Sequence, residues 1–224
     1  MGGTRYPQFC ALARAAELVG ERWTLLIVRE LRQAPRRFGD LRERLDGLSP
    51  SVLTQRLGRL EAAGLVARRY LEPPAASTVY DLTAAGRALE PALLALTRWG
   101  TRWLLPPRPR ERLDAEWLRL ALHACARRTP SPTVALQLRV RAPRTDVLLR
   151  VEGGPDGTRV TDEAGPADMT GTADFRTMVA LVTGRLSPSA ARRDRGVRLD
   201  GDPTALDHLP DLFDLAPPTR RQDD

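Results

Sequence analysis

Four polar side chains in one short stretch have the types and the spacing of a surface that reads DNA. They are Ser51, Thr54, Gln55 and Arg59. Glutamine can pair with two atoms of adenine and arginine with two atoms of guanine, whereas hydroxyl groups reach either bases or phosphates. At 100° per residue these four side chains spread over one side of a helix. The pattern predicts base contacts by Gln55 and Arg59, and its plain alternative is a helix face that only meets solvent.

The helix that must carry these side chains is well marked at its start. The Ser49 hydroxyl can accept a hydrogen bond from a free amide of the first turn, and Pro50 suits the first helical position, where no amide is needed. Leu53, Leu57 and Leu60 fall on the face opposite the polar side chains, where they can enter a core. The sequence therefore predicts an amphipathic helix with a polar outer face.

The segments around this helix predict a winged helix-turn-helix. A short helix over 38–45 and a turn over 46–48 precede it, which is the arrangement of a helix-turn-helix motif. Strand-like runs over 65–71 and 78–82 follow it, separated by Pro73–Ser77, and they predict a hairpin wing. Two helices over 9–19 and 23–32 and a long helix over 84–104 complete the predicted domain. The apolar stripe of the long helix is wide enough for a dimer contact, and its members are Leu89, Leu93, Leu96, Trp99 and Trp103.

The positive charge of the chain lies in the same half. Residues 1–105 carry 16 arginines against 10 acidic residues, a net charge of +6, out of +7 for all 224 residues. A positive face attracts a polyanion independently of base sequence. We expect phosphate contacts from five arginines near the predicted helix: Arg36, Arg37, Arg56, Arg68 and Arg69.

The second half of the chain has a different character. Pro106–Arg110 has the composition of a semi-rigid linker. Beyond it a helix over 113–127 is followed by strand-like runs, by helices that begin near Asp174, Ser187 and Asp202, and by a strand over 197–199. We therefore expect a multi-domain chain with a winged helix-turn-helix α+β domain over 1–105, a linker over 106–110, a second α+β domain with a mainly antiparallel sheet over 111–216, and a disordered tail over 217–224.

The first half resembles the HxlR-type winged helix-turn-helix regulators, which are close to the MarR group. The matching stretches stand in the correct order: Cys10 before a helix, Glu21–Ile27, Arg36–Leu41, Leu48–Pro50, Leu53–Leu57, Leu60–Val66, Tyr80–Thr83 and Gly86. This resemblance implies a homodimeric transcription factor, often a repressor, that binds a near-palindromic operator in double-stranded DNA. It also implies that the helix over 50–62 enters the major groove and that the helix over 84–104 pairs with a second copy. The wing over 73–78 departs from the family pattern because it has no arginine.

The second half resembles the sterol carrier protein type two fold. The matching stretches are Ala167–Thr170, Thr172–Phe175, Leu181–Pro188 and Val197–Pro203. This resemblance implies a sheet covered by helices around an apolar cavity for a hydrophobic small molecule. The expected effector of the regulator is therefore a hydrophobic small molecule bound in this domain.

The two cysteines, Cys10 and Cys125, do not form the pattern of a disulfide framework or of a metal site. Cys10 is a candidate redox switch, since members of the resembling family often carry a sensing thiol there, although a cysteine on an apolar helix is more often packed. We find no arrangement typical of catalytic residues, of a nucleotide loop or of a cofactor site, and therefore expect no enzyme. No apolar run reaches membrane-spanning length, and we expect a cytoplasmic protein.

These observations predict a dimeric DNA-binding repressor that responds to a hydrophobic small molecule. Two alternatives stay open at this point. One is a regulator whose signal is oxidation of Cys10. The other is a small-molecule carrier whose winged half has no role in DNA binding.

Overall fold

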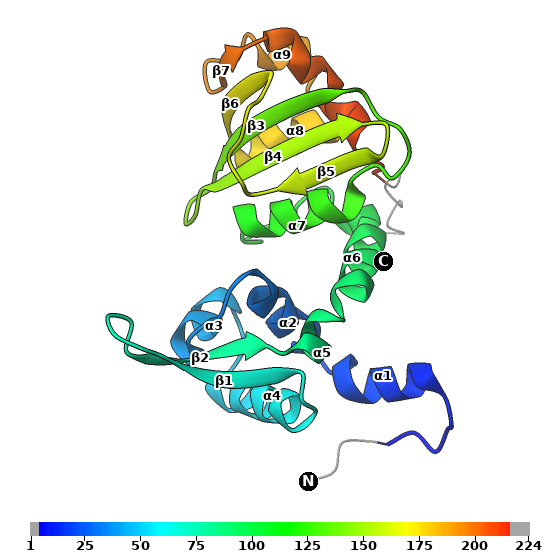
Figure 1. Ribbon diagram of the computed structural model, residues 1–224, viewed down its shortest axis with the longest axis vertical. Helices are drawn as coiled ribbons and strands as arrows, with labels where there is room; N and C mark the ends of the chain where they lie inside the picture. Colours follow the sequence, from blue (N-terminus) through cyan, green and yellow to red (C-terminus); the bar gives the residue numbers. More distant parts are fainter. Residues whose placement is uncertain (1–4, 216–224) are drawn as a thin grey trace. The chain divides into compact units, whose positions relative to one another are not determined.

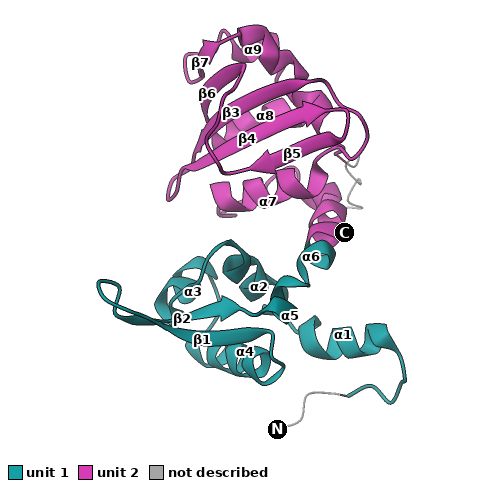
Figure 2. Cartoon of the chain, in the orientation of Figure 1, with its two compact units in different colours: residues 1–93 teal, residues 94–224 magenta. Residues whose placement is uncertain are grey.

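The computed structural model describes residues 5–215, and the tail expected over 217–224 lies outside this range. The chain divides into two compact units, residues 1–93 and 94–224, which are coloured separately in Figure 2. No helix within residues 5–215 is long and apolar enough to cross a membrane. The domain bounds expected from the sequence stay a prediction.

Unit 1 is built from helices and one hairpin (Figure 1). Its core contains Ile27 and Leu31 from one helix and Leu53, Leu57 and Leu60 from another, all at most 1% exposed. The strands pair antiparallel from Val66↔Leu82 to Leu71↔Ser77. The elements are α1 (Ala11–Val19), α2 (Thr24–Gln33), α3 (Phe38–Arg44), α4 (Pro50–Ala62), β1 (Val66–Leu71), β2 (Ser77–Leu82) and α5 (Ala84–Arg87).

Helix α4 begins as its sequence predicts. The Ser49 hydroxyl accepts a hydrogen bond from the Val52 amide at 3.4 Å, and Pro50 occupies the first turn. Gly47 in the turn between α3 and α4 has φ +84°, and Gly64 after α4 has φ +69°. Both values lie in the left-handed region that glycine adopts without strain. The helix-turn-helix and the start of the wing are therefore fixed by local sequence.

The single helix expected over 84–104 is divided in the structure, so that prediction was wrong in its length. Helix α5 ends at Arg87, α6 spans Glu90–Gly100, and a 3-10 turn, η1, spans Thr101–Trp103. Pro91 explains the break, because it has no amide to donate to the Arg87 carbonyl and its ring crowds that position. The expected helix is thus a helical segment with a bend near its start.

Unit 2 contains a five-stranded sheet in the order β5-β4-β3-β6-β7. Strand β3 pairs parallel with β6, whereas the β3–β4, β4–β5 and β6–β7 pairs are antiparallel. The sheet is therefore mixed, and a purely antiparallel description does not fit it. Its strands are β3 (Val134–Arg141), β4 (Val147–Gly154), β5 (Gly157–Thr161), β6 (Met169–Asp174) and β7 (Arg198–Gly201).

One face of this sheet is covered by helices, and α8 lies behind it in Figure 1. Side chains of β3 alternate, so that Leu136 and Leu138 enter the core while Gln137 and Arg139 point to the other face. The covering elements are α7 (Ala115–Cys125), α8 (Phe175–Val182), α9 (Pro188–Ala191) and η2 (Pro203–Leu212), where a 3-10 helix replaces the expected final helix. The opposite face of the sheet carries polar and charged side chains.

Candidate nucleic-acid interface

The outer side of α4 presents the polar side chains that its sequence predicts. Ser51, Thr54 and Gln55 are exposed. Gly58 lies on the same side, and a Cβ atom added there would meet nothing within 4 Å. This open position leaves room for a close approach of a partner surface between Gln55 and Arg59. The structure therefore brings the candidate base-reading groups together on one accessible helix face.

Glu21 holds two arginines of this helix, a contact that the sequence analysis did not single out. Its two carboxylate oxygens form ion pairs with Arg56 and Arg59. The Arg56 side chain is only 16% exposed and also donates from Nε to the Arg22 carbonyl at 3.3 Å. Burial and repulsion by Arg59 lower the pKa of Arg56 from its ordinary value. Either guanidinium must exchange Glu21 for a base or a phosphate before it binds DNA.

The other arginines expected at phosphates also have partners within unit 1. Arg68 pairs with Glu61 at 2.9 Å, and Arg69 pairs with Asp81 at 3.0 Å. Both arginine side chains are more than half exposed, at 57% and 54%. Such exposed pairs exchange partners at low cost. Arg68 and Arg69 therefore stay available to phosphates.

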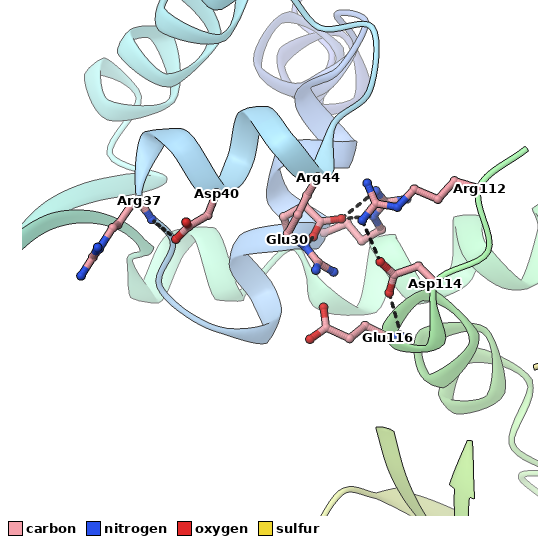
Figure 3. A network of polar contacts seen from close by, with 8 residues as sticks. Glu30, Arg37, Asp40, Arg44, Arg112, Asp114 and Glu116 are labelled. Carbon is pink, nitrogen blue, oxygen red and sulfur yellow. Dashed lines mark hydrogen bonds and ion pairs between the residues drawn. The ribbon is translucent and has the colours of Figure 1, made fainter. Parts of the chain in front are cut away.

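Arg36 and Arg37 connect the start of α3 with the wing. The backbone of Arg36 exchanges two hydrogen bonds with Tyr80 of β2, at 3.0 and 2.8 Å. The Arg37 side chain donates to the Ala75 carbonyl in the wing turn at 3.1 Å. Its backbone amide donates to the Asp40 carboxylate, also at 3.1 Å, as Figure 3 shows. These contacts fix the wing turn beside the start of α3.

A buried carboxylate positions the first helix of the motif. Glu30 of α2 is fully buried and pairs with Arg44 of α3 at 2.5 Å and with Arg29 at 2.7 Å (Figure 3). Removal of one partner from such a pair leaves an uncompensated charge in the core. The sequence signal was a glutamate at a core-facing position of α2, beside Ile27 and Leu31. This ion pair orients α3 and, through the turn, α4.

The residues predicted for dimer contact differ in their surroundings. Leu93 is buried and Leu89 is partly buried against the core of unit 1. Leu96 and Trp99 are 47% and 60% exposed. Trp103 packs edge-on against Trp99, with ring centroids 4.5 Å apart. Within the predicted stripe, Leu96 and Trp99 are the most available for a contact with a second copy.

The two cysteines also differ. Cys10 is exposed and stands immediately before α1, whereas Cys125 is buried at the end of α7. Burial raises the pKa of the Cys125 thiol from its ordinary value. Within the described part of the chain, no three His, Cys, Asp or Glu side chains gather in a way that could hold a metal ion. Cys10 is thus the thiol that a solvent-borne oxidant reaches.

Comparison with known protein families matches residues 18–107 to the HxlR-like helix-turn-helix model. A helix-turn-helix regulator of Mycobacterium bovis, Mb3122, is 41% identical over 115 residues, which cover 51% of this chain and 68% of the relative. Regulator sll1512 of Synechocystis is 36% identical over 95 residues, covering 42% of this chain and 70% of the relative. YodB of Bacillus subtilis is 31% identical over 106 residues, or 47% of this chain and 92% of YodB.

Solved structures include the reduced form of the transcriptional regulator YodB from B. subtilis. It is 29% identical, covers 45% of this chain and 100% of that chain, and has a TM-score of 0.39. The family match ends at residue 107, before α7 begins at Ala115. The relatives therefore inform the winged half of the molecule.

Proposed function

The chain belongs to the HxlR-like helix-turn-helix family of transcriptional regulators, and we propose that it acts as a homodimeric repressor on a near-palindromic operator. The observation that carries this proposal is the capped helix α4, whose exposed side holds Ser51, Thr54 and Gln55 beside an open Gly58. A helix of this kind after a tight turn fits the major groove. The wing and the arginines around α4 supply the contacts with phosphates.

In the proposed complex, the interface side chains contact either the bases or the phosphates of DNA. Gln55 and Arg59 contact base edges, and Ser51 and Thr54 contact bases or phosphates. Five arginines contact the backbone and set the register: Arg36, Arg37, Arg56, Arg68 and Arg69. Exposed Leu96 and Trp99 support pairing of two copies through α6. Two copies of α4 must then lie about 34 Å apart, one DNA turn, to use both half-sites.

A gel shift with the DNA upstream of the protein's own gene tests this proposal. We expect specific binding that weakens steeply as salt rises, because phosphate contacts release bound counterions. A scrambled duplex of the same length is the control. The Gln55→Ala variant should show a smaller difference in affinity between the two duplexes. Equal binding of both duplexes by the unaltered protein would contradict sequence-specific reading. Absence of DNA binding would favour the small-molecule carrier.

We further propose that unit 2 is a sensor domain with a fold like that of the sterol carrier proteins and that its effector is a hydrophobic small molecule. The helices that cover one face of its sheet support this assignment. A ligand acts only through a difference in its affinity for the states with and without DNA. Effector affinity measured with and without operator DNA should therefore differ, and equal affinities would exclude the coupling.

A second candidate signal is oxidation at Cys10, which the exposure of this thiol favours. An oxidant such as a quinone should then release the protein from DNA. The Cys10→Ser variant should keep its DNA affinity under the same treatment. Release of the serine variant by the oxidant would exclude this thiol as the sensor, and Cys125, which is buried, serves as the internal comparison.

A further inference from the structure

The face of the unit 2 sheet that the helices leave open contains a depression of about 340 Å³. Small-molecule sites usually have volumes of about 300 to 1,000 Å³. Its lining comes from the four adjacent strands β4, β3, β6 and β7 and includes Gln137, Arg139, Leu148, Thr170, Thr172, Arg198 and Asp200. The depression is therefore separate from the apolar core on the other face of the sheet.

The strand register places these side chains in two rows. In the first row, Arg139 of β3 lies between Leu148 of β4 and Thr172 of β6, and Thr172 is in turn paired with Arg198 of β7. Neighbouring strands lie about 4.8 Å apart, so the two arginines stand about 10 Å apart on either side of Thr172. Two positive groups thus flank one hydroxyl group on the floor.

The second row lies two residues further along the strands. It runs from Arg150 of β4 through Gln137 and Thr170 to Asp200 of β7. Arg150 has its own carboxylate partner, Glu152, at 2.6 Å. The free functional groups of this row are therefore the Thr170 hydroxyl and the Asp200 carboxylate.

Two chain segments contact β3 on the same face as the depression. The segment between β5 and β6 crosses this face, where the Gly165 amide donates to the Gln137 side-chain oxygen at 3.0 Å. A Cβ atom at Gly165 would lie 2.8 Å from Arg150, so the crossing segment rests directly on that side chain. At the other end Arg141 donates to the Gly196 carbonyl before β7, at 3.4 Å. Both segments therefore lie next to the depression on the open face of the sheet.

The arginine side chains of the first row have no ion-pair partner. Within residues 5–215, the side chains of Arg139 and Arg198 make no hydrogen bond or ion pair, in contrast with that of Arg150. The two like charges repel each other in this arrangement, and an anion between them removes the repulsion. Asp200 gives the same depression one acceptor that suits a hydroxyl or amine group.

We infer that this depression binds a small organic anion, with its anionic group between Arg139 and Arg198 above the Thr172 hydroxyl. A hydrogen-bond donor of the ligand meets the Asp200 carboxylate in the second row. This anion site lies on the open face of the sheet and is separate from the hydrophobic effector proposed for unit 2. Binding itself requires no DNA, so it can be measured separately.

The test uses the full chain and two probes, inorganic phosphate and 4-hydroxyphenylacetate, followed by NMR and calorimetric titration. The neutral amide of 4-hydroxyphenylacetate is the control ligand. We expect saturable binding of both anions and at least about tenfold weaker binding of the amide, since hydrogen bonds to charged groups dominate the contact. Failure of both anions to saturate would overturn the inference.

Two variants locate the site. Arg139→Gln and Arg198→Gln should each weaken binding of 4-hydroxyphenylacetate at least about tenfold. Arg159→Gln is the matched control, because Arg159 is an exposed arginine of β5 outside the lining, and it should leave binding unchanged. Equal effects of all three substitutions would show a general charge effect and overturn the site.

A last titration separates a nucleic-acid surface from a small-molecule site. A double variant with both glutamines should keep the affinity of the unaltered protein for a scrambled duplex. If its affinity for the duplex falls by about the same factor as its affinity for 4-hydroxyphenylacetate, the depression is part of a polyanion-binding surface and the inference fails. Anion binding by a protein that gives no gel shift with DNA would instead contradict the proposed function and still support this site.

Discussion

The outer face of α4 and the open face of the unit 2 sheet both display a pair of arginines, yet the pairs differ in what holds them. Arg56 and Arg59 share the carboxylate of Glu21, whereas Arg139 and Arg198 flank a hydroxyl and have no carboxylate partner in the described chain. In the proposed DNA complex the first pair must exchange the Glu21 carboxylate for a base or a phosphate. In the proposed anion complex the second pair gains an anion and breaks no ion pair.

This difference shows that the availability of a charge depends on the partner that the fold supplies. An exchange of ion pairs adds less net affinity than a new contact by an unpaired arginine, because the broken pair offsets part of the new one. It adds selectivity, since a weak or misplaced acceptor does not displace Glu21. We therefore expect this exchange to contribute more to the difference in affinity between specific and scrambled duplexes than to the affinity itself.

The largest expected effect comes from a substitution on the buried face of α4. Leu57→Ala in α4 should lower the free energy of unfolding of unit 1 by about 2 to 5 kcal/mol, since Leu57 is 1% exposed in the core. Thr54→Ala, on the exposed side of the same helix, should change it by less than about 0.5 kcal/mol. Chemical denaturation followed by NMR measures both. Equal effects of the two substitutions would contradict the assignment of the two faces of α4.

Arg59→Ala should cost about 1 to 3 kcal/mol of specific binding and relax the preference at one operator position. The reason is loss of a paired contact with guanine. Binding to a set of operators with single base changes measures the effect, with Arg159→Ala as a distant control. Unchanged affinity for specific and scrambled duplexes alike would exclude Arg59 from base reading.

The two helix caps should respond differently to pH. The Ser49 hydroxyl caps α4 and the Asp174 carboxylate caps α8, so Ser49→Ala and Asp174→Ala should each cost about 1 kcal/mol at pH 7. Hydrogen bonds from the Thr177 amide and hydroxyl hold the pKa of Asp174 below its ordinary value of 3.8. Its contribution is complete above that value and is lost as the pH falls through the lower folded pKa.

Denaturant titrations at several pH values would show this contrast. The cost of Asp174→Ala should shrink in acid, while the cost of Ser49→Ala stays constant because the hydroxyl does not titrate there. A cost of Asp174→Ala that is independent of pH would show that the carboxylate charge is not what caps α8.

The smallest expected effect comes from removing the carboxylate that pairs with Arg56 and Arg59 of α4. Glu21→Gln should strengthen DNA binding about two- to fivefold, the value of a partly exposed ion pair, and should reduce discrimination between specific and scrambled duplexes. Glu163→Gln, which changes the net charge equally at an exposed site of unit 2, is the control. Weaker binding of the Glu21 variant would show that the carboxylate positions the arginines instead of competing for them.

Local signals made the winged half predictable from sequence. Ser49, Pro50 and Gly64 mark the ends of α4, and the leucine spacing fixes its buried face. These features act within a few residues, so one sequence is enough to read them. The family resemblance rested on the same residues, and the match over residues 18–107 confirms it.

Features that join distant residues could not be read in this way. The pairing of Glu21 with Arg56 and Arg59 spans more than thirty residues, and the depression of unit 2 depends on the order of four strands. Side-chain alternation along a strand is enough to put Gln137 and Arg139 on one face of β3, but the parallel neighbour β6 and the position of β7 came only from the structure. The prediction of one helix over 84–104 followed its apolar stripe and did not consider Pro91, at which the structure breaks the helix.

The parallel pairing of β3 with β6 has a further consequence for how the chain acquires its structure. Its partners, such as Leu136 and Met169, lie far apart in the sequence, whereas the β1–β2 hairpin closes over a few residues. Contacts between distant residues require costly loop closure, so they slow folding. During synthesis the helix-turn-helix can therefore fold before the sheet of unit 2 closes. In a hydrogen-exchange measurement during refolding, the amides of β1 should become protected earlier than those of β6.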